Sequence, residues 1–236
     1  MNTATLLEKS RPFLDYILTW MEERPAIPLS DVARDPQATA VISVDVINGF
    51  CHEGPLASPR VRDIIRPIVR LFEKAHALGV AHIILTQDTH DPQAVEFQSY
   101  PPHCIRGTAE SESVPEFKTL PFYGRMTVIP KNSISSTIET ALAGWLEERP
   151  EVNTFIVVGD CTDLCTYQLA MGLRLRANAR NLRQRVIVPV DCVDTYDLPV
   201  AVAQEIGAVP HDGDLLHLVF LYSMMLNGVE VVRSLL

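Results

Sequence analysis

Long apolar runs are missing from the sequence, and none approaches the roughly 20 residues that a membrane-spanning helix needs. The N-terminal segment has apolar stretches, but Glu8, Lys9 and Arg11 interrupt them, so the unbroken apolar core of a signal peptide is absent. We therefore expect a protein that neither spans a membrane nor carries a secretory signal.

Basic residues are in the minority. Lys and Arg total 20, against 29 Asp and Glu, which gives a formal net charge of −9. Nucleic acids and anionic membranes attract basic surfaces. This charge balance therefore argues against both as main partners.

The sequence lacks the cysteine spacing of a disulfide framework, and no dinucleotide-binding glycine motif is present. The five cysteines are an odd number without the spacing of a secreted disulfide framework: Cys51, Cys104, Cys161, Cys165 and Cys192. We expect reduced thiols and a cytoplasmic location. No G-x-G-x-x-G follows the first predicted strand, so a nucleotide-binding oxidoreductase is disfavoured.

The rest of the composition is that of an ordinary globular chain. Of the 236 residues, 47% are hydrophobic and 21% are charged. This length suits a single α/β unit. Such a chain can bury a sizeable core without disulfides or metals.

Short apolar runs alternate with helical patterns along the chain. The predicted strands are residues 40–46, 81–87, 126–131, 154–159 and 185–191, and an apolar segment at 229–236 closes the chain. The predicted helices are residues 61–79, 137–150, 163–179 and 213–226. This alternation is typical of a parallel sheet that is covered on both faces. We predict a doubly wound, three-layer α/β/α fold with a mainly parallel sheet of about six strands.

The first 38 residues stand apart from this pattern. Ser10 can cap a helix, with Pro12 in its first turn. An apolar stripe follows, made of Phe13, Leu14, Ile17, Leu18 and Met21. We predict a helical extension over residues 1–38, packed on the core or on a partner subunit, then the main domain at 39–236. We also expect a homo-oligomer.

In such a sheet the reactive groups lie at the carboxyl ends of the strands. The polar residues that follow the predicted strands are Asp45, Asp88, His90, Lys131, Cys161, Cys165 and Asp191. They are far apart in sequence, but the predicted fold brings them to one edge of the sheet.

Cys165 falls in the first turn of a predicted helix, where the helix dipole stabilises a thiolate. Its thiol should therefore ionise more easily than a free one. Lys131 would favour the thiolate further, and Asp45 could accept the proton, so nucleophile, cation and base come together from three strands. The alternatives are a small core residue, a redox pair with Cys161, or a zinc ligand.

The segment 88–125 is long and contains five prolines, which indicates a functional loop. Asp88 and His90 are two residues apart, so an extended backbone points both side chains to one face. Glu96 and His103 follow on the loop. Two imidazoles and two carboxylates suit zinc, iron or manganese. The alternative is that both histidines are structural.

The ordered set of motifs resembles the isochorismatase-like cysteine hydrolases, and within them the nicotinamidases. The resemblance covers most of residues 40–233. Its motifs are SVDVINGF at 43–50, TQDTH at 86–90, YPPHCIRGT at 100–108, IPK at 129–131 and VVGDCTDLC at 157–165.

The resemblance implies a catalytic triad that falls on Asp45, Lys131 and Cys165. It also implies an oxyanion hole formed by the backbone N–H groups of Cys161 and Cys165, beside a cis peptide between Asp160 and Cys161. The implied activity is that of an amidohydrolase acting on linear amides. It would cleave the C–N bond of a small, nicotinamide-like amide through a thioester.

A divalent metal is the implied cofactor, with zinc ahead of iron or manganese. The positions that match the family's ligands are Asp88, His90, His103 and Glu96. In nicotinamidases the metal binds the pyridine nitrogen of the substrate. Aromatic side chains that line the pocket match Phe50 and Tyr100.

Two departures from the family pattern bear on the substrate and the oxyanion hole. Residues 134–137 read ISST, without the aromatic rings common in relatives, and Asp160 stands where relatives usually have an apolar residue. Two alternatives remain open. One is a metal-independent isochorismatase-type hydrolase of another small substrate, and the other is a catalytically silent binding relative.

Overall fold

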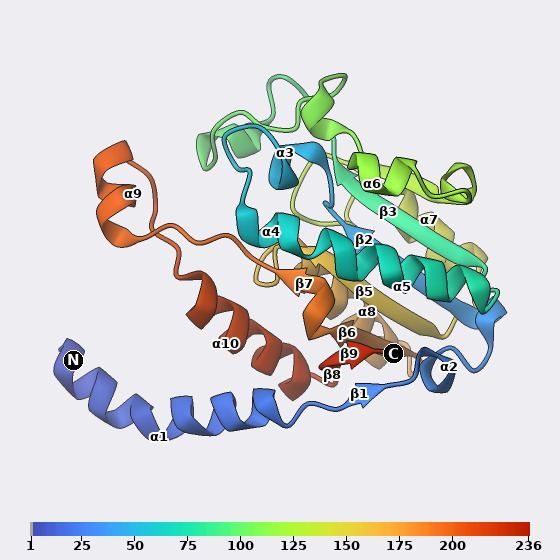
Figure 1. Ribbon diagram of the computed structural model, residues 1–236, viewed down its shortest axis with the longest axis horizontal. Helices are drawn as coiled ribbons and strands as arrows, with labels where there is room; N and C mark the ends of the chain where they lie inside the picture. Colours follow the sequence, from blue (N-terminus) through green and yellow to red (C-terminus); the bar gives the residue numbers. More distant parts are fainter. Residues whose placement is uncertain (1) are drawn as a thin grey trace.

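A seven-stranded sheet forms the centre of the computed structural model, which describes residues 2–236 (Figure 1). Its strands are β2 (Thr39–Val44), β3 (His82–Asp88), β4 (Thr127–Lys131), β5 (Thr154–Asp160), β6 (Arg185–Pro189), β7 (Val193–Asp194) and β8 (Glu230–Val232). The order is β4-β3-β2-β5-β6-β8, and β7 pairs with the end of β5. Every pairing is parallel, which confirms the predicted sheet.

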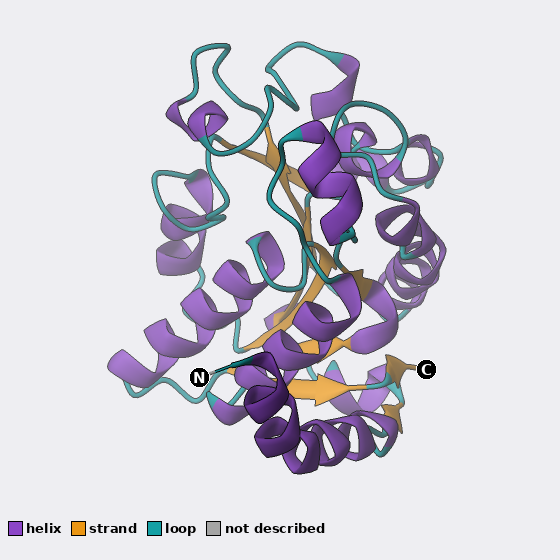
Figure 2. Ribbon diagram, turned by 90° about the vertical axis from the view of Figure 1, so that its left-hand side faces the viewer, coloured by secondary structure: helices purple, strands orange, loops and turns teal. Residues whose placement is uncertain are grey.

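Helices cover both faces of the sheet (Figure 2). One face packs against α2 (Leu29–Val32), α4 (Pro59–Asp63), α5 (Ile65–Ala77) and α6 (Pro115–Lys118). The other packs against α1 (Thr3–Glu22), α7 (Ala141–Glu148), α8 (Cys165–Ala179) and α10 (Gly213–Leu226). The short α3 (Asn48–Cys51) follows β2, and α9 (Val200–Ile206) projects from the body of the molecule.

Short 3₁₀ turns complete the connections, at Pro36–Ala38, Val95–Gln98, Ala109–Ser111, Tyr123–Arg125 and Val190–Cys192. A separate two-stranded parallel pair joins β1 (Ala26–Ile27) to β9 (Ser234–Leu235), so segments near the two ends of the chain lie side by side. Within residues 2–236, no helix combines the length and the apolar character needed to cross a membrane.

Local sequence accounts for the main elements. All six residues of β2 are buried, as expected for a central strand of a sheet covered on both faces. In α5 the buried residues recur at helical spacing: Ile65, Ile68, Leu71, Phe72 and Ala75. The helix α5 thus supplies much of one layer of the core, whereas β2 contributes Val41 to that layer and Ala40, Ile42 and Val44 to the opposite one.

The order of the strands reverses between β2 and β5, which lie next to each other at the centre. In doubly wound sheets, the crevice outside the carboxyl ends of such a pair binds the ligand. Val44 and Gly159 are register partners there. Gly159 has φ 116°, and a Cβ atom at this position would overlap the Val44 carbonyl oxygen, so the close approach of the two strands requires glycine.

The N-terminal helix differs from the prediction. It begins at Thr3 because Asn2 caps it, accepting a hydrogen bond from Thr5 N at 2.9 Å, and Pro12 lies inside the helix. Phe13 is 47% exposed, so the predicted stripe is not uniformly buried. Contact with α10 is concentrated instead around Tyr222, against whose ring Phe13, Tyr16 and Trp20 pack edge-on.

Two other predicted helices have different bounds. The helix predicted at 61–79 is divided at Ile64 into α4 and α5, and the helix predicted at 137–150 begins only at Ala141, where Thr140 caps it. Asp191 does not join the other polar side chains at the strand ends. It lies in a 3₁₀ turn and borders a cavity of about 140 Å³ with Arg70 and Lys74.

Candidate active site

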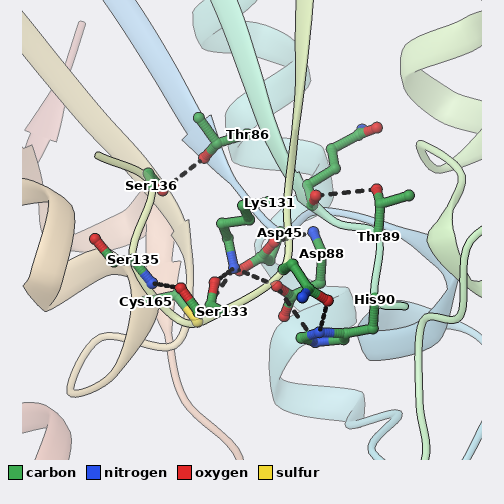
Figure 3. Close-up of polar contacts among 12 residues, drawn as sticks. Asp45, Thr86, Asp88, Thr89, His90, Lys131, Ser133, Ser135, Ser136 and Cys165 are labelled. Carbon is green, nitrogen blue, oxygen red and sulfur yellow. Dashed lines mark hydrogen bonds and ion pairs between the residues drawn. The ribbon is translucent and has the colours of Figure 1, made fainter. Parts of the chain in front are cut away.

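Lys131, the last residue of β4, lies at the centre of the polar cluster (Figure 3). Its Nζ atom lies 2.8 Å from Asp45 Oδ2, 2.5 Å from Asp88 Oδ1 and 3.8 Å from Cys165 Sγ. It also donates to the Ser133 carbonyl at 3.0 Å. The acid, the amine and the thiol predicted to meet at the strand ends are therefore in contact, and all are buried.

Asp45 follows β2 directly and has a left-handed backbone conformation with φ 55°, which is uncommon for a residue with a side chain. Its Oδ1 accepts a hydrogen bond from Asp88 N at 2.8 Å, which orients the carboxylate. Burial, and next the charge of Asp88, raise the pKa of Asp45 to about 7, although Lys131 opposes the shift. This carboxylate is therefore a suitable proton acceptor near neutral pH.

Cys165 lies in the first turn of α8, as predicted, although the helix begins at Cys165 and not at residue 163. The ionisation of its thiol differs from the prediction. Burial raises the pKa of the Cys165 thiol well above its usual value. Lys131 lowers this pKa, whereas Asp45 and Asp88 raise it again. The expected easy ionisation is thus wrong for the free site, because desolvation outweighs the cation and the helix N-terminus. A base must remove the thiol proton during reaction.

Charge balance explains why an amine and two carboxylates tolerate burial together. Burial alone would lower the pKa of Lys131, but Asp45 and Asp88 raise it well above the usual value. Burial alone would raise the pKa of Asp88, but Lys131 and next His90 hold it below the usual value. Lys131 therefore remains charged and neutralises the centre of the cluster.

The loop between β5 and α8 carries the two backbone N–H groups that the resemblance assigns to an oxyanion hole. The peptide bond between Asp160 and Cys161 is cis, as the resemblance implied. Within residues 2–236, neither Cys161 N nor Cys165 N donates to a backbone carbonyl oxygen. Both are thus available to an external oxygen atom. Burial holds the pKa of the neighbouring Asp160 well above its usual value, which favours a neutral carboxyl there.

Asp88, His90 and His103 form a second buried group that shares Asp88 with the first. One potential ligand atom from each lies within 4.8 Å of the other two. His90 Nε2 is 3.5 Å from Asp88 Oδ1, and His103 Nε2 is 4.0 Å from Asp88 Oδ2. Ligand atoms around a tetrahedral zinc ion are about 3.3–3.5 Å apart. The spacing between His90 and Asp88 matches this range, and the spacing between His103 and Asp88 is somewhat wider, so the group resembles a site for a divalent cation.

Hydrogen bonds direct the Nε2 lone pairs of both histidines toward this group. His103 Nδ1 lies 2.8 Å from the Pro101 carbonyl, which can only accept, so this nitrogen carries the proton. Asn132 Oδ1 accepts a hydrogen bond from Asp91 N at 2.8 Å and lies 3.3 Å from His90 Nδ1. Since this oxygen can only accept, His90 Nδ1 also carries its proton. Among the described residues, His90 Nε2 is buried without a hydrogen-bond partner. An unpaired buried acceptor of this kind suits a metal ligand.

Glu96 lies in the turn Val95–Gln98, close to this group but outside the three-residue set. Burial, and next the charge of Asp88, raise the pKa of Glu96 above its usual value. Its role as a fourth ligand stays a prediction.

Aromatic rings surround the histidines. Phe50 and Tyr100, predicted to line the pocket, have ring centroids 5.6 and 6.2 Å from that of His103. Phe97 lies equally close, at 5.6 Å from His103 and 5.4 Å from His90. No sequence motif singles out Phe97, although its place one residue after Glu96 is a usable signal.

Two further polar residues near the site were not predicted from the sequence. Asn132 orients His90, and its position directly after Lys131 could have indicated this. Asp163, in the loop before Cys165, pairs with His211 at 2.8 Å. These two residues are 48 positions apart, so no local pattern joins them.

The fold and these two polar groups are those of a hydrolase. The model of the isochorismatase domain family matches residues 39–206, and the chain therefore belongs to that family. Among curated proteins it is 32% identical to nicotinamidase 1 of Arabidopsis thaliana, in an alignment of 229 positions that covers 90% of this chain and 91% of that relative.

Solved structures share the fold. A cysteine hydrolase from Pseudomonas syringae pv. phaseolicola 1448A has a TM-score of 0.69 and 23% identity, covering 84% of this chain and 89% of the other. A pyrazinamidase of Pyrococcus horikoshii in complex with zinc has a TM-score of 0.64 and 22% identity, covering 83% of this chain and 99% of the other.

Proposed function

We propose that this protein hydrolyses a small amide of the nicotinamide type, with Cys165 as nucleophile, Asp45 as base and Lys131 as the charge-balancing cation. The observation that carries the proposal is the contact of Lys131 Nζ with Asp45, Asp88 and the Cys165 sulfur at one point. The identity to a plant nicotinamidase along most of the chain supports the substrate class.

The first step forms the nucleophile. Asp45 takes the thiol proton as Cys165 attacks the amide carbonyl carbon, and a bond forms between sulfur and carbon. The electron pair of the carbonyl moves to oxygen. The backbone N–H groups of Cys161 and Cys165 stabilise this oxyanion, and each such donor typically contributes about 3–4 kcal/mol.

The second step releases ammonia. The C–N bond breaks as the oxyanion reforms the carbonyl, and Asp45 returns its proton to the leaving nitrogen. A thioester on Cys165 remains. A water molecule then gives a proton to Asp45 and attacks the thioester carbon. The C–S bond breaks, the acid is released, and Asp45 returns the proton to the thiolate.

We propose that Asp88, His90 and His103 hold a divalent metal, zinc first, with iron or manganese as alternatives and Glu96 as a further ligand. When bound, such a cation would supply a Lewis acid that accepts a ring nitrogen of the substrate. The unpaired Nε2 of His90 and the spacing of the three ligand atoms support this site. The Pyrococcus pyrazinamidase structure in complex with zinc is consistent with it.

The proposed pocket accepts a flat ring. Phe50, Phe97 and Tyr100 lie around the histidine pair and offer apolar faces to an aromatic substrate. The segment after Lys131 contributes hydroxyls instead of rings: Ser135 and Ser136 are buried, and Ser136 Oγ lies 3.0 Å from Thr86 Oγ1. This difference favours testing several small amides rather than nicotinamide alone.

The test is ammonia release from a panel of small amides, nicotinamide and pyrazinamide included, with and without a chelator. We expect turnover by the metal-loaded protein, and none by a Cys165→Ala variant. Turnover that persists after complete metal removal would favour the metal-independent alternative. Equal ammonia release by the parent and Cys165→Ala would favour a catalytically silent binding relative.

We also propose a cytoplasmic location and a homo-oligomeric state. All five cysteines are free and buried, which supports a reducing compartment. Exposed apolar side chains on α1 and α10 support self-association, among them Leu7 and Leu226, which are 60% and 65% exposed. Cell fractionation and light scattering of the purified protein test the two statements separately.

A further inference from the structure

Residues 161–165 join β5 to α8 and present both N–H groups of the proposed oxyanion hole. The loop backbone is attached to the rest of the sheet by Thr162 N, which donates to the Asp194 carbonyl at 3.0 Å. Its central residue, Asp163, is 7% exposed, although aspartate is seldom buried unless it is paired. Thr162 Oγ1 also lies 2.8 Å from His217 Nδ1 on α10. The partners of Asp163 add the remaining side-chain contacts that hold the loop.

Both carboxylate oxygens of Asp163 are paired. Thr195 Oγ1 donates to Oδ1 at 2.6 Å, and His211 Nε2 lies 2.8 Å from Oδ2. His211 Nδ1 lies 2.8 Å from the Tyr196 carbonyl oxygen. The imidazole is thus placed between two acceptors, and a proton shared with Asp163 completes the chain of hydrogen bonds.

His211 also closes a hairpin. Its N–H and carbonyl pair with those of Leu198 at 2.9 and 2.7 Å, which joins the two ends of segment 198–211 (hereafter the arm), the part of the chain that carries α9. Residues 194–195 precede the arm and form its base. Arg60 on α4 binds this base by donating to Thr195 O at 3.0 Å and to Asp194 Oδ1 at 2.9 Å. Asp163 is therefore bonded to Thr195 in the base of the arm, which Arg60 holds in place, and to His211 at the end of the arm.

We propose that the Asp163–His211 pair positions the oxyanion hole by fixing the loop 161–165 against the base of the arm. The proposal rests on the proposed function, since it assigns the N–H groups of Cys161 and Cys165 to the substrate oxygen. Neither Asp163 nor His211 touches the reacting atoms. They act through the loop backbone, whose displacement by about 1 Å can reduce a rate by about 100-fold.

Three variants separate hydrogen bonding from packing. Asp163→Ala removes both carboxylate contacts. His211→Phe removes both ring nitrogens but keeps a ring against Tyr196, whose centroid lies 3.8 Å from that of His211. Asp163→Asn keeps every contact, because its Oδ1 can accept from Thr195 and its Nδ2 can donate to the Nε2 of a neutral His211. Val209→Ser, at a 79% exposed site on the arm, is the matched control.

We expect kcat to fall by about 10- to 100-fold in Asp163→Ala and His211→Phe, with KM within about threefold of the parent value. The double variant should be no slower than Asp163→Ala alone, because both changes break one chain of contacts. Asp163→Asn and Val209→Ser should remain within about threefold of the parent.

Two further measurements separate this role from general loosening of the fold. Alkylation of Cys165 by iodoacetamide needs the thiol but no oxyanion hole, so its rate should be the same in all variants. Pyridine-3-carbaldehyde adds the thiol across its C=O bond: sulfur bonds to carbon, the carbonyl electron pair moves to oxygen, and Asp45 takes the thiol proton. The resulting oxyanion needs the hole, so aldehyde affinity should fall in parallel with kcat.

The outcomes distinguish this proposal from the proposed function. A parent protein that hydrolyses no amide contradicts the proposed function, while aldehyde affinity still tests the pair. Aldehyde affinity unchanged in Asp163→Ala and His211→Phe overturns the positioning role, as does alkylation that slows as much as turnover. Loss of both turnover and aldehyde affinity in Asp163→Asn overturns it as well, because that variant preserves the contacts.

Discussion

The ammonium group of Lys131 lies 2.5 Å from a carboxylate oxygen of Asp88. This ion pair joins the proposed catalytic triad to the proposed metal site, because Lys131 also contacts Asp45 and Cys165, and Asp88 also faces His90 and His103. A change on either side of this pair therefore alters the charge that the other side experiences.

Replacement of Lys131 by Met should destabilise the fold as well as abolish turnover. It leaves Asp45 and Asp88 buried without their cation, and breaking a buried ion pair in this way costs about 3–5 kcal/mol. Urea unfolding of the parent and the variant measures the difference. The matched control is Lys118→Met, which breaks an exposed pair with Glu112 and should cost under about 1 kcal/mol. Equal stability of the Lys131 variant and the parent would contradict this account.

The two cysteines of the loop should respond differently to replacement. Cys165→Ala removes the proposed nucleophile and should leave no measurable ammonia release, while its zinc content should equal that of the parent. Cys161→Ala keeps the backbone N–H through which Cys161 is proposed to act, so kcat should stay within about threefold of the parent. Rapid acid quench and mass spectrometry should detect the acyl group on Cys165 in the parent. An acyl group on Cys161 instead would reverse the assignment.

Activity should decrease as the pH falls below neutral. Burial raises the pKa of Asp45 to about 7, and Asp45 must be ionised to accept the thiol proton. Below that pH the carboxyl is protonated and the base is lost, so kcat/KM should show an acid limb well above the ordinary range of aspartate. The profile is recorded with metal in excess. A profile that stays flat down to pH 5 would argue against Asp45 as the base.

Metal content should depend on both histidines. His90→Ala or His103→Ala should reduce bound zinc, measured by elemental analysis, from about one per chain to below about a tenth. Asn132→Ala should weaken zinc affinity by about 10- to 100-fold, because it removes the partner that orients His90. The control is His52→Ala, which removes a pairing with Glu116 on the surface and should leave metal content unchanged. Full zinc occupancy in His103→Ala would refute the proposed ligand set.

Gly159→Ala should destabilise the protein by more than about 3 kcal/mol or prevent its folding. The added Cβ atom would overlap the Val44 carbonyl, and φ 116° is strained for alanine. Gly144→Ala is the control, since open space surrounds that position in α7 and alanine favours a helix by up to about 1 kcal/mol. Thermal unfolding compares the two. A Gly159 variant as stable as the parent would show that β2 and β5 can separate without cost.

Local pattern was sufficient for much of the fold. The helix predicted at 213–226 has those bounds, because Asp212 caps it and the chain turns at Gly228. The strand predictions were right to within one or two residues, since short apolar runs that alternate with helical patterns are typical of buried parallel strands. The predicted helix start at Ser10 is too late, because Asn2 is as good a cap as Ser10 and Pro12 lies inside the helix and not in its first turn.

The sequence by itself determined which chemical groups stand at the ends of the parallel strands, because strand-to-helix connections place those residues on one edge. Tertiary structure alone decided how those groups behave. Burial keeps the Cys165 thiol protonated, Asp191 points away from the cluster, and Asp163 meets His211 from a distant part of the chain. Desolvation and contacts between distant residues depend on three-dimensional packing, and no local spacing of residues encodes them.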